Sequence, residues 1–156
     1  FAAVAMSSSS AFLEALTEVA LTKISAFGSQ SLSATAWSLA KLILRKEELL
    51  QAISAQCVLK VASFAPQNLA NAAWAFAKLQ VKDDFFMSAI ASRVATMKEA
   101  IPKELSSTLW AFAKLACSDV VFFHAVADIA ESKIGQCDSQ SLSNLVWAFA
   151  TVLIEP

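Results

Sequence analysis

The sequence contains few of the residues that make turns and catalytic centres. It has two Gly, three Pro, one His and no Tyr among 156 residues. Two Gly and three Pro are too few for the many turns of an all-β fold, and two Gly do not make a Gly-rich phosphate loop. Charged residues make up 16% of the chain and the net charge is −1, which is not the basic signature of a nucleic-acid binder.

Cysteine and hydrophobic patterning exclude two further classes of site. Cys57, Cys117 and Cys137 show no CxxC pairing, so we expect reduced thiols in a non-secreted protein and no metal site. No run of 18 apolar residues occurs, so we expect no transmembrane segment.

Catalytic residues are equally hard to find. His124 is the only histidine, and within "VVFFHAV" it is expected to be a packed or half-exposed side chain. Acidic residues gather at expected helix starts, where they complement the helix dipole (Glu47, Glu48, Asp83 and Asp84). The sequence therefore predicts a protein that is not an enzyme, with no catalytic residue, no cofactor and no small-molecule substrate.

Alanine is what the chain has in excess. It contributes 31 residues, and apolar residues together make up 57%. Alanine is the best helix former and lets neighbouring helices approach closely. The composition therefore predicts an all-α fold.

A tryptophan-centred phrase recurs four times along the chain. It reads "SLSATAWSLAKL" at 31–42, "NLANAAWAFAKL" at 68–79, "ELSSTLWAFAKL" at 104–115 and "SLSNLVWAFATV" at 141–152. Successive tryptophans are 37, 36 and 37 residues apart; they are Trp37, Trp74, Trp110 and Trp147. Counted from Trp as position 0, positions −5, 0, +2, +3 and +5 are apolar and form one broad helical face. The phrase predicts helices over 30–44, 67–81, 103–117 and 140–153, which we call the B helices.

The residues that flank these phrases indicate where the helices begin. Pro66 and Pro102 lie eight residues before a Trp, where a first-turn proline lacks only an amide that the helix would not use. Ser29 and Ser139 occupy the same offset and are expected to cap their helices.

A second helical stretch lies between successive B helices. We expect these A helices over 9–27, 47–64, 84–100 and 119–134. Asp83 and either Ser118 or Asp119 are plausible caps. Gly28 and Gly135 follow expected helix ends, where a left-handed residue commonly stops a helix.

One helical hairpin cannot bury both of its apolar faces, whereas stacked hairpins can. We therefore expect a single domain over 1–156, a right-handed α-solenoid of about four helix–turn–helix repeats of about 37 residues. The repeats would cover about 9–46, 47–83, 84–119 and 120–156, with each Trp packed between adjacent hairpins. "FAAV" at 1–4 matches "FATV" at 149–152, so residues 1–8 are expected to end a preceding repeat, the alternative being a frayed, Ala-rich terminus.

The L-x-x-x-x-W-A-x-A-K-L pattern and the repeat length resemble the octotricopeptide repeat (OPR) family. The resemblance covers the four units. It implies an α-solenoid located in an organelle, either chloroplast or mitochondrion. It also implies binding of single-stranded RNA, in the stability, processing or translation of transcripts.

A polar ribbon on the B helices is the candidate RNA-binding site. Positions −7, −3, +1 and +4 follow one another at helical steps of three or four. At −3 we single out Asn71, Ser107 and Asn144, which can bond base edges, and at +4 Lys41, Lys78 and Lys114, which can neutralise phosphates. The small residues at +1 would let a base approach; they are Ser38, Ala75, Ala111 and Ala148. A solvated or protein-contacting face, with the lysines complementing the helix dipole, is the alternative.

A structural or adaptor role is the alternative function. Such a subunit would dock by protein–protein contacts in a large organellar complex, for example a ribosome or a photosynthetic or respiratory assembly. The low charge and high hydropathy favour this hypothesis.

Overall fold

A computed structural model describes residues 2–154, with side chains from residue 10 to residue 152. Within these residues the chain is all-α, with eight α-helices, three short 3-10 helices and no strand, which confirms the expected class. The elements are α1 (Ala2–Lys23), η1 (Ile24–Ala26), α2 (Ser29–Lys41), α3 (Glu47–Lys60), η2 (Val61–Ser63), α4 (Pro66–Lys78), α5 (Asp84–Val94), α6 (Pro102–Lys114), α7 (Val120–Glu131), η3 (Ile134–Gln136) and α8 (Ser139–Ile154).

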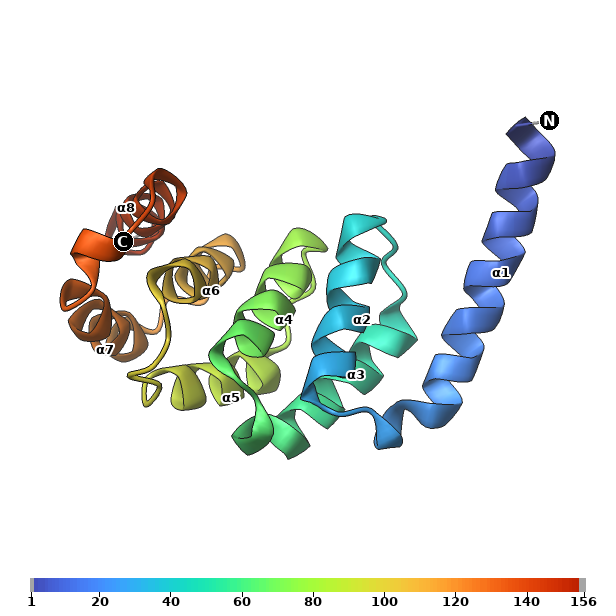
Figure 1. Ribbon diagram of the computed structural model, residues 1–156, viewed down its shortest axis with the longest axis horizontal. Helices are drawn as coiled ribbons and strands as arrows, with labels where there is room; N and C mark the ends of the chain where they lie inside the picture. The colour runs from blue at the N-terminus through green and yellow to red at the C-terminus, as the bar shows by residue number, and fades with distance from the viewer. Residues whose placement is uncertain (1, 155–156) are drawn as a thin grey trace.

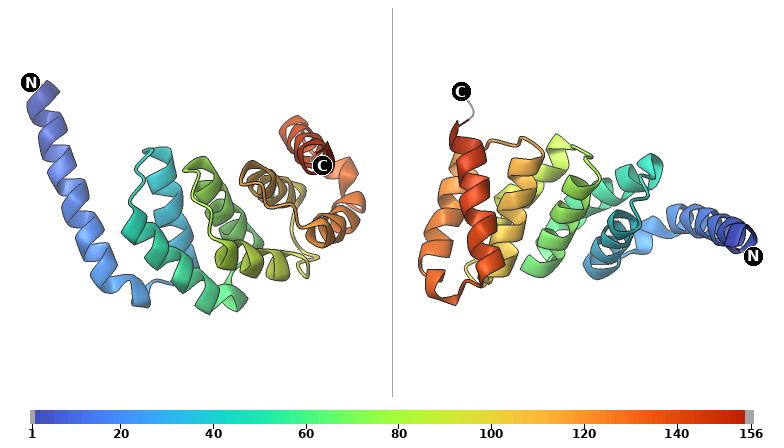
Figure 2. Two further views of the ribbon diagram at one scale, coloured as in Figure 1. Left: turned by 180° about the vertical axis from the view of Figure 1, so that it is seen from behind. Right: turned by 90° about the horizontal axis from the view of Figure 1, so that it is seen from above.

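The helices form four hairpins that follow one another in a curved row (Figure 1). The B helices α2, α4, α6 and α8 pack each on the next, and these are the largest contacts between elements. They lie along the inner side of the row, whereas α3, α5 and α7 lie along the outer side (Figures 1 and 2). The amino-terminal helix α1 leans away from α2 towards the top of the view (Figure 1).

The core runs along the row between the two layers of helices. The leucines at position −5 are fully buried in the first three B helices; they are Leu32, Leu69 and Leu105. Phe76 of α4 lies 4.5 Å from Phe86 of α5, and Phe112 of α6 lies 4.3 Å from Phe122 of α7, measured between ring centroids. Each aromatic pair joins one hairpin to the next, so burial depends on neighbouring hairpins.

The B helices end three residues earlier than the sequence predicts for the first three units. Their last residues are Lys41, Lys78 and Lys114, and a left-handed residue follows each helix, with φ of 56° at Ile43, 55° at Gln80 and 52° at Ala116. The next amide then bonds back across the turn, for example from Leu44 N to Leu39 O at 2.9 Å. This is a Schellman motif, which satisfies carbonyls at the helix end. The expectation that glycines stop helices is wrong, because neither glycine has a positive φ.

The helix starts agree with the sequence in part. Pro66 and Pro102 are the first residues of α4 and α6, as expected. Asp83 and Asp119 cap α5 and α7 by accepting hydrogen bonds from Phe86 N and Phe122 N, both at 3.0 Å.

The two expected serine caps are wrong. Ser29 and Ser139 are the first residues inside α2 and α8. Gly28 precedes α2 without a side-chain cap. At α8, Asp138 Oδ1 accepts a hydrogen bond from Ser141 N at 2.7 Å. The carboxylate one residue earlier reaches the free amides, so the serine hydroxyl is not needed there.

The amino-terminal segment also differs from the expectation. The helix α1 runs without a break from Ala2 to Lys23, so residues 2–8 and the helix expected from residue 9 are one element. The segment contains no Gly or Pro that would end a helix. Phe1, on which the match to a preceding repeat partly rests, lies outside the described residues. The assignment of 1–8 to a preceding repeat stays a prediction.

Lysines join consecutive hairpins through backbone carbonyls. Lys60 Nζ donates to Ser25 O at 2.7 Å and to Phe27 O at 2.8 Å. Two hairpins further on, Lys133 Nζ donates in the same way to Lys98 O at 2.5 Å and to Ala100 O at 2.6 Å. The same polar link therefore recurs along the row.

Candidate binding groove

Positions −7, −3, 0 and +4 of each B helix form one stripe, which we call the inner stripe. At 100° per residue these four positions fall within about 60° of one another around the helix. On α6 they are Lys103, Ser107, Trp110 and Lys114. The stripe lies opposite position +2, where Phe76 and Phe112 point into the core. It is therefore the side of the B helices that faces away from α3, α5 and α7.

The tryptophans belong to this stripe. Trp37 and Trp147 are each 42% exposed, and Trp74 and Trp110 are half-buried. The indoles of Trp110 and Trp147 lie side by side, with ring centroids 6.2 Å apart and planes inclined by 37°. The expectation that each Trp is packed between hairpins is thus met only in part, because the rings stay partly exposed on the inner stripe.

Two cavities open along the inner stripe. A cavity of about 340 Å³ lies between α6 and α8, and one of about 270 Å³ lies between α4 and α6. The larger is lined by Trp74, Lys103, Ser106, Ser107, Trp110, Asp138, Gln140, Ser141 and Asn144. The smaller is lined by Gln67, Ala70, Asn71, Ile101, Lys103, Glu104 and Ser107. Lys103 and Ser107 border both, so we treat the two as one inner groove.

The groove brings together only some of the candidate residues. Asn71 and Ser107 line the smaller cavity, and Ser107 and Asn144 line the larger one. The lysines at +4 line neither cavity. They are the exposed last residues of α2, α4 and α6, and seven residues of helix place them about 10 Å along the axis from position −3.

The small residues at +1 are not part of this surface. Ala75, Ala111 and Ala148 are fully buried, whereas Ser38 at the same position of α2 is exposed. Position +1 therefore faces the preceding B helix, and the expected row of small residues is wrong. The tryptophans occupy the middle of the stripe instead. Sequence reasoning missed them because Trp was counted with the core, although its spacing of three and seven from the polar positions indicates one face.

The groove carries both signs of charge. Hydrogen bonds from the Ser141 side chain and backbone hold the pKa of the Asp138 carboxyl below its usual range, so this group is ionised at neutral pH. Lys103 lines the same cavity. Glu104 adds a second carboxylate in the smaller cavity. A groove with two carboxylates, one ammonium and several amides and hydroxyls suits a partner that is recognised by hydrogen bonds and stacking more than by net charge.

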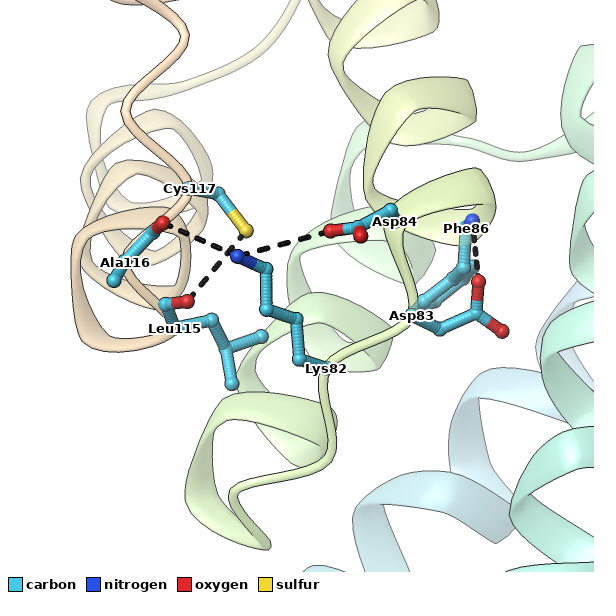
Figure 3. A network of polar contacts seen from close by, with 7 residues as sticks. All are labelled: Lys82, Asp83, Asp84, Phe86, Leu115, Ala116 and Cys117. Carbon is cyan, nitrogen blue, oxygen red and sulfur yellow. Dashed lines mark hydrogen bonds and ion pairs between the residues drawn. The ribbon is translucent and has the colours of Figure 1, made fainter.

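Two of the three thiols, Cys57 and Cys117, are in settings that keep them unreactive. Burial raises the pKa of the Cys57 thiol to about 12. Burial also raises the pKa of Cys117, against the opposing effect of the Lys82 ammonium. Figure 3 shows Cys117 beside Lys82, whose Nζ donates to Ala116 O at 3.3 Å and lies 3.7 Å from Asp84 Oδ1. A thiol that stays protonated at neutral pH is a poor nucleophile and metal ligand.

Within residues 2–154, no group of three or more His, Cys, Asp or Glu side chains is placed to hold a metal ion. None of the helices in that range combines the length and apolar character needed to cross a lipid bilayer. His124 is exposed and borders a small apolar cavity of about 40 Å³ with Phe123 and Phe149.

Taken together, the stacked hairpins and the inner groove define an all-α helical-repeat protein with an open polar and aromatic surface. A family model described as RNA-editing substrate-binding complex 6 protein (RESC6) matches residues 1–120. Because that match covers more than half of the chain, the protein belongs to the RESC6 family. The comparison with curated proteins gives no match.

This finding corrects the resemblance to the OPR family, which is wrong. The repeated Leu and Ala positions that carried the resemblance are packing positions in the structure. In α4 and α6 they are all buried; they are Leu69, Ala75, Ala77 and Leu79, and Leu105, Ala111, Ala113 and Leu115. Any row of close-packed helical hairpins needs small and branched apolar residues at such positions. The pattern therefore indicated the architecture and did not distinguish one repeat family from another.

Proposed function

We propose that the protein is a non-catalytic subunit of an RNA-editing substrate-binding complex, in which it acts as a helical-repeat adaptor that docks on other protein subunits. Membership of the RESC6 family carries this proposal. The proposed partner is therefore an RNA-editing complex, and not a ribosome or a photosynthetic or respiratory assembly. Of the two organelles, a mitochondrion suits such a complex, and nothing supports a chloroplast. For the overall architecture we propose the right-handed α-solenoid that the repeats predict.

Exposed apolar side chains support a docking role. Phe85 on α5 and Val121 on α7 are almost fully exposed on the outer layer, and Phe12 on α1 is largely exposed. Large exposed apolar groups commonly mark protein contact surfaces. The low share of charged residues points the same way, because it leaves few groups for attraction to phosphate.

Purification from mitochondria tests this function. We expect the tagged protein to carry a defined set of proteins through washing, and to retain most of them after nuclease treatment. A Phe85→Ser, Val121→Ser variant should lose part of the set without loss of helical circular dichroism, because both side chains are exposed. Release of every partner by nuclease would contradict the adaptor role and indicate association through RNA.

Direct contact with single-stranded RNA is the second candidate function, favoured by the inner groove. The adjacent indoles of Trp110 and Trp147 offer faces on which bases can stack, an interaction worth about 1–3 kcal/mol per base. Asn71, Ser107 and Asn144 supply hydrogen-bonding groups along the same groove. Lys41 Nζ lies over the Trp37 ring, 5.4 Å from its centroid, so one of the lysines at position +4 also lies against an indole.

Anisotropy of short fluorescent RNAs tests the groove. We expect Trp110→Ala to weaken binding about tenfold or more, and Asn144→Ala to change base preference. Replacing Lys41, Lys78 and Lys114 together by Ala should weaken binding to all sequences and reduce its dependence on salt. Phe85→Ala, on the outer layer, is the matched control. The absence of binding to a random RNA pool at low salt would rule this candidate out.

A further inference from the structure

The cavity between α6 and α8 lies at a seam between B helices that only short polar side chains fill. Position −4 of one B helix and position −6 of the next meet at each such seam. Between α2 and α4 these are Ser33 and Asn68, and Asn68 Nδ2 donates to Ser33 Oγ at 3.3 Å. Between α6 and α8 they are Ser106 and Ser141, both nearly fully buried. Two hydroxyls reach less far across a seam than an amide does, so space remains above them.

This cavity has the size and the walls for one planar group. Its volume of about 340 Å³ is near the lower limit of small-molecule sites, which suits a single base. Trp74 and Trp110, both half-buried, supply aromatic walls on which a base can stack. The cavity opens on the inner stripe, the side of the B helices that faces away from the outer layer, so a single strand can reach it.

One carboxylate and one ammonium line the polar side of the same cavity. Asp138 is exposed, and its Oδ1 accepts a hydrogen bond from Ser141 N at 2.7 Å. A carboxylate has about four acceptor sites, so acceptors remain on both oxygens. Hydrogen bonds from Ser141, and also the Lys103 ammonium, hold the pKa of the Asp138 carboxyl below its usual range. The cavity therefore presents a group that only accepts hydrogen bonds together with a group that only donates them.

The four RNA bases differ in what they present to such a carboxylate. On its Watson–Crick edge guanine has two adjacent donors, N1–H and the N2 amino group, beside the O6 acceptor. Adenine and cytosine each place a ring-nitrogen acceptor next to a single amino group, and uracil flanks its one N–H with two carbonyl oxygens. An ionised carboxylate repels these acceptors, so guanine is the base whose edge it matches.

We infer that the cavity between α6 and α8 binds one guanine base of a single-stranded RNA. The base stacks on Trp110, its N1–H and N2 amino group donate to Asp138, and its O6 accepts from Lys103. The inference rests on the second candidate function, direct contact with RNA. It makes Asp138 the residue that selects the base. Asp138 precedes α8 and lies outside the polar ribbon of the B helices, so helical periodicity alone does not point to it.

Anisotropy of short fluorescent oligouridines with one variable central nucleotide tests the base preference. We expect a central guanosine to bind about tenfold more tightly than adenosine, cytidine or uridine. Inosine, which lacks the N2 amino group of guanosine, should lose most of this advantage without any change in the protein. Equal binding of the guanosine and adenosine strands would overturn the inference, although binding that depends on Trp110 would still support RNA contact. The absence of binding to every strand would overturn both.

Asp138→Asn tests the selecting residue. Asparagine also caps helices, so α8 should keep its start and its circular dichroism. The amide has one acceptor oxygen in place of two, so the preference for guanosine should fall to about twofold or less. Asp119→Asn is the matched control, because Asp119 caps α7 in the same way, through Phe122 N at 3.0 Å, on the outer layer. An undiminished preference in Asp138→Asn, or an equal loss in Asp119→Asn, would contradict the assignment.

Discussion

The middle and the ends of the row place the same repeat positions in different surroundings. Leu79 at position +5 of α4 is 6% exposed, whereas Leu42 at position +5 of α2 is 55% exposed. At position −1, Leu109 is fully buried in α6 and Val146 is largely exposed in α8. Residue type hardly differs between the members of each pair. Burial in this protein is therefore decided by whether a neighbouring hairpin is present.

This difference has consequences for stability. In a row of repeats each hairpin contacts only its neighbours, so stability is approximately a sum of hairpin and interface contributions. A hairpin in the middle has two interfaces and an end hairpin has one. Substitutions at equivalent positions should therefore have unequal effects, and the size of the inequality measures how much each interface contributes.

The largest effect is expected at the aromatic position +2. Phe112 is buried in α6 against Phe122, whereas Phe149 of α8 is half-buried with its ring 5.5 Å from that of Phe123. Phe112→Ala should lower the free energy of unfolding by about 3–5 kcal/mol. Phe149→Ala should cost clearly less, because part of its ring is already solvated. Urea unfolding followed by circular dichroism measures both, and equal losses would contradict the comparison.

Position +5 isolates the effect of a neighbour with the side chain held constant. Leu79→Ala should cost about 2–4 kcal/mol, and Leu42→Ala less than about 1 kcal/mol. The measurement is again urea unfolding followed by circular dichroism. Equal losses for the two variants would contradict the comparison.

Much of the row was predictable from the sequence. The four Trp-centred phrases predicted the B helices, and Pro66 and Pro102 marked two of their starts to the residue. These features are local: helix periodicity and proline chemistry act within a few residues. The all-α class followed from composition alone.

The inner groove was predictable only in part. The apolar positions −5, 0, +2, +3 and +5 cover more than half of the helix circumference, so periodicity could not tell which edge faces the core. That choice depends on the neighbouring helices, which bury Ala75 and leave Trp74 partly open. The left-handed turn at Ile43 was missed because a β-branched residue rarely adopts that conformation.

The buried thiol of the middle hairpins gives a pH-dependent test. Cys57 has a pKa of about 12 in the folded protein, against an ordinary value near 9. Its contribution to stability is complete below pH 9 and is lost as the pH rises from 9 towards 12, because the unfolded chain releases the proton first. Stability should fall by about 2 kcal/mol by pH 10.5 from this group alone.

Two controls separate Cys57 from other groups that titrate at high pH. Cys57→Ala should flatten the pH dependence in this range relative to the parent, whatever its cost at neutral pH. Alkylation at pH 8 should modify the half-buried Cys137 of the last hairpin before Cys57, which should react only on unfolding. Rapid labelling of Cys57 in the folded protein would show that the middle of the row opens as readily as its end.

The smallest effect concerns the turn between the first two hairpins, where substitution should stabilise the protein. Ile43 has a φ of 56° and is 77% exposed, so it adopts a strained backbone conformation with little burial in return. Ile43→Gly should relieve this strain, offset partly by the greater freedom of glycine in the unfolded chain, for a net gain of about 0.5–1 kcal/mol. Gln80→Gly at the equivalent turn between α4 and α5 should gain less, because an unbranched side chain tolerates the left-handed region better. Ile43→Val keeps the β-branch and should gain nothing. A lowered urea midpoint for Ile43→Gly would instead show that the freedom of glycine in the unfolded chain outweighs the relief of strain at this turn.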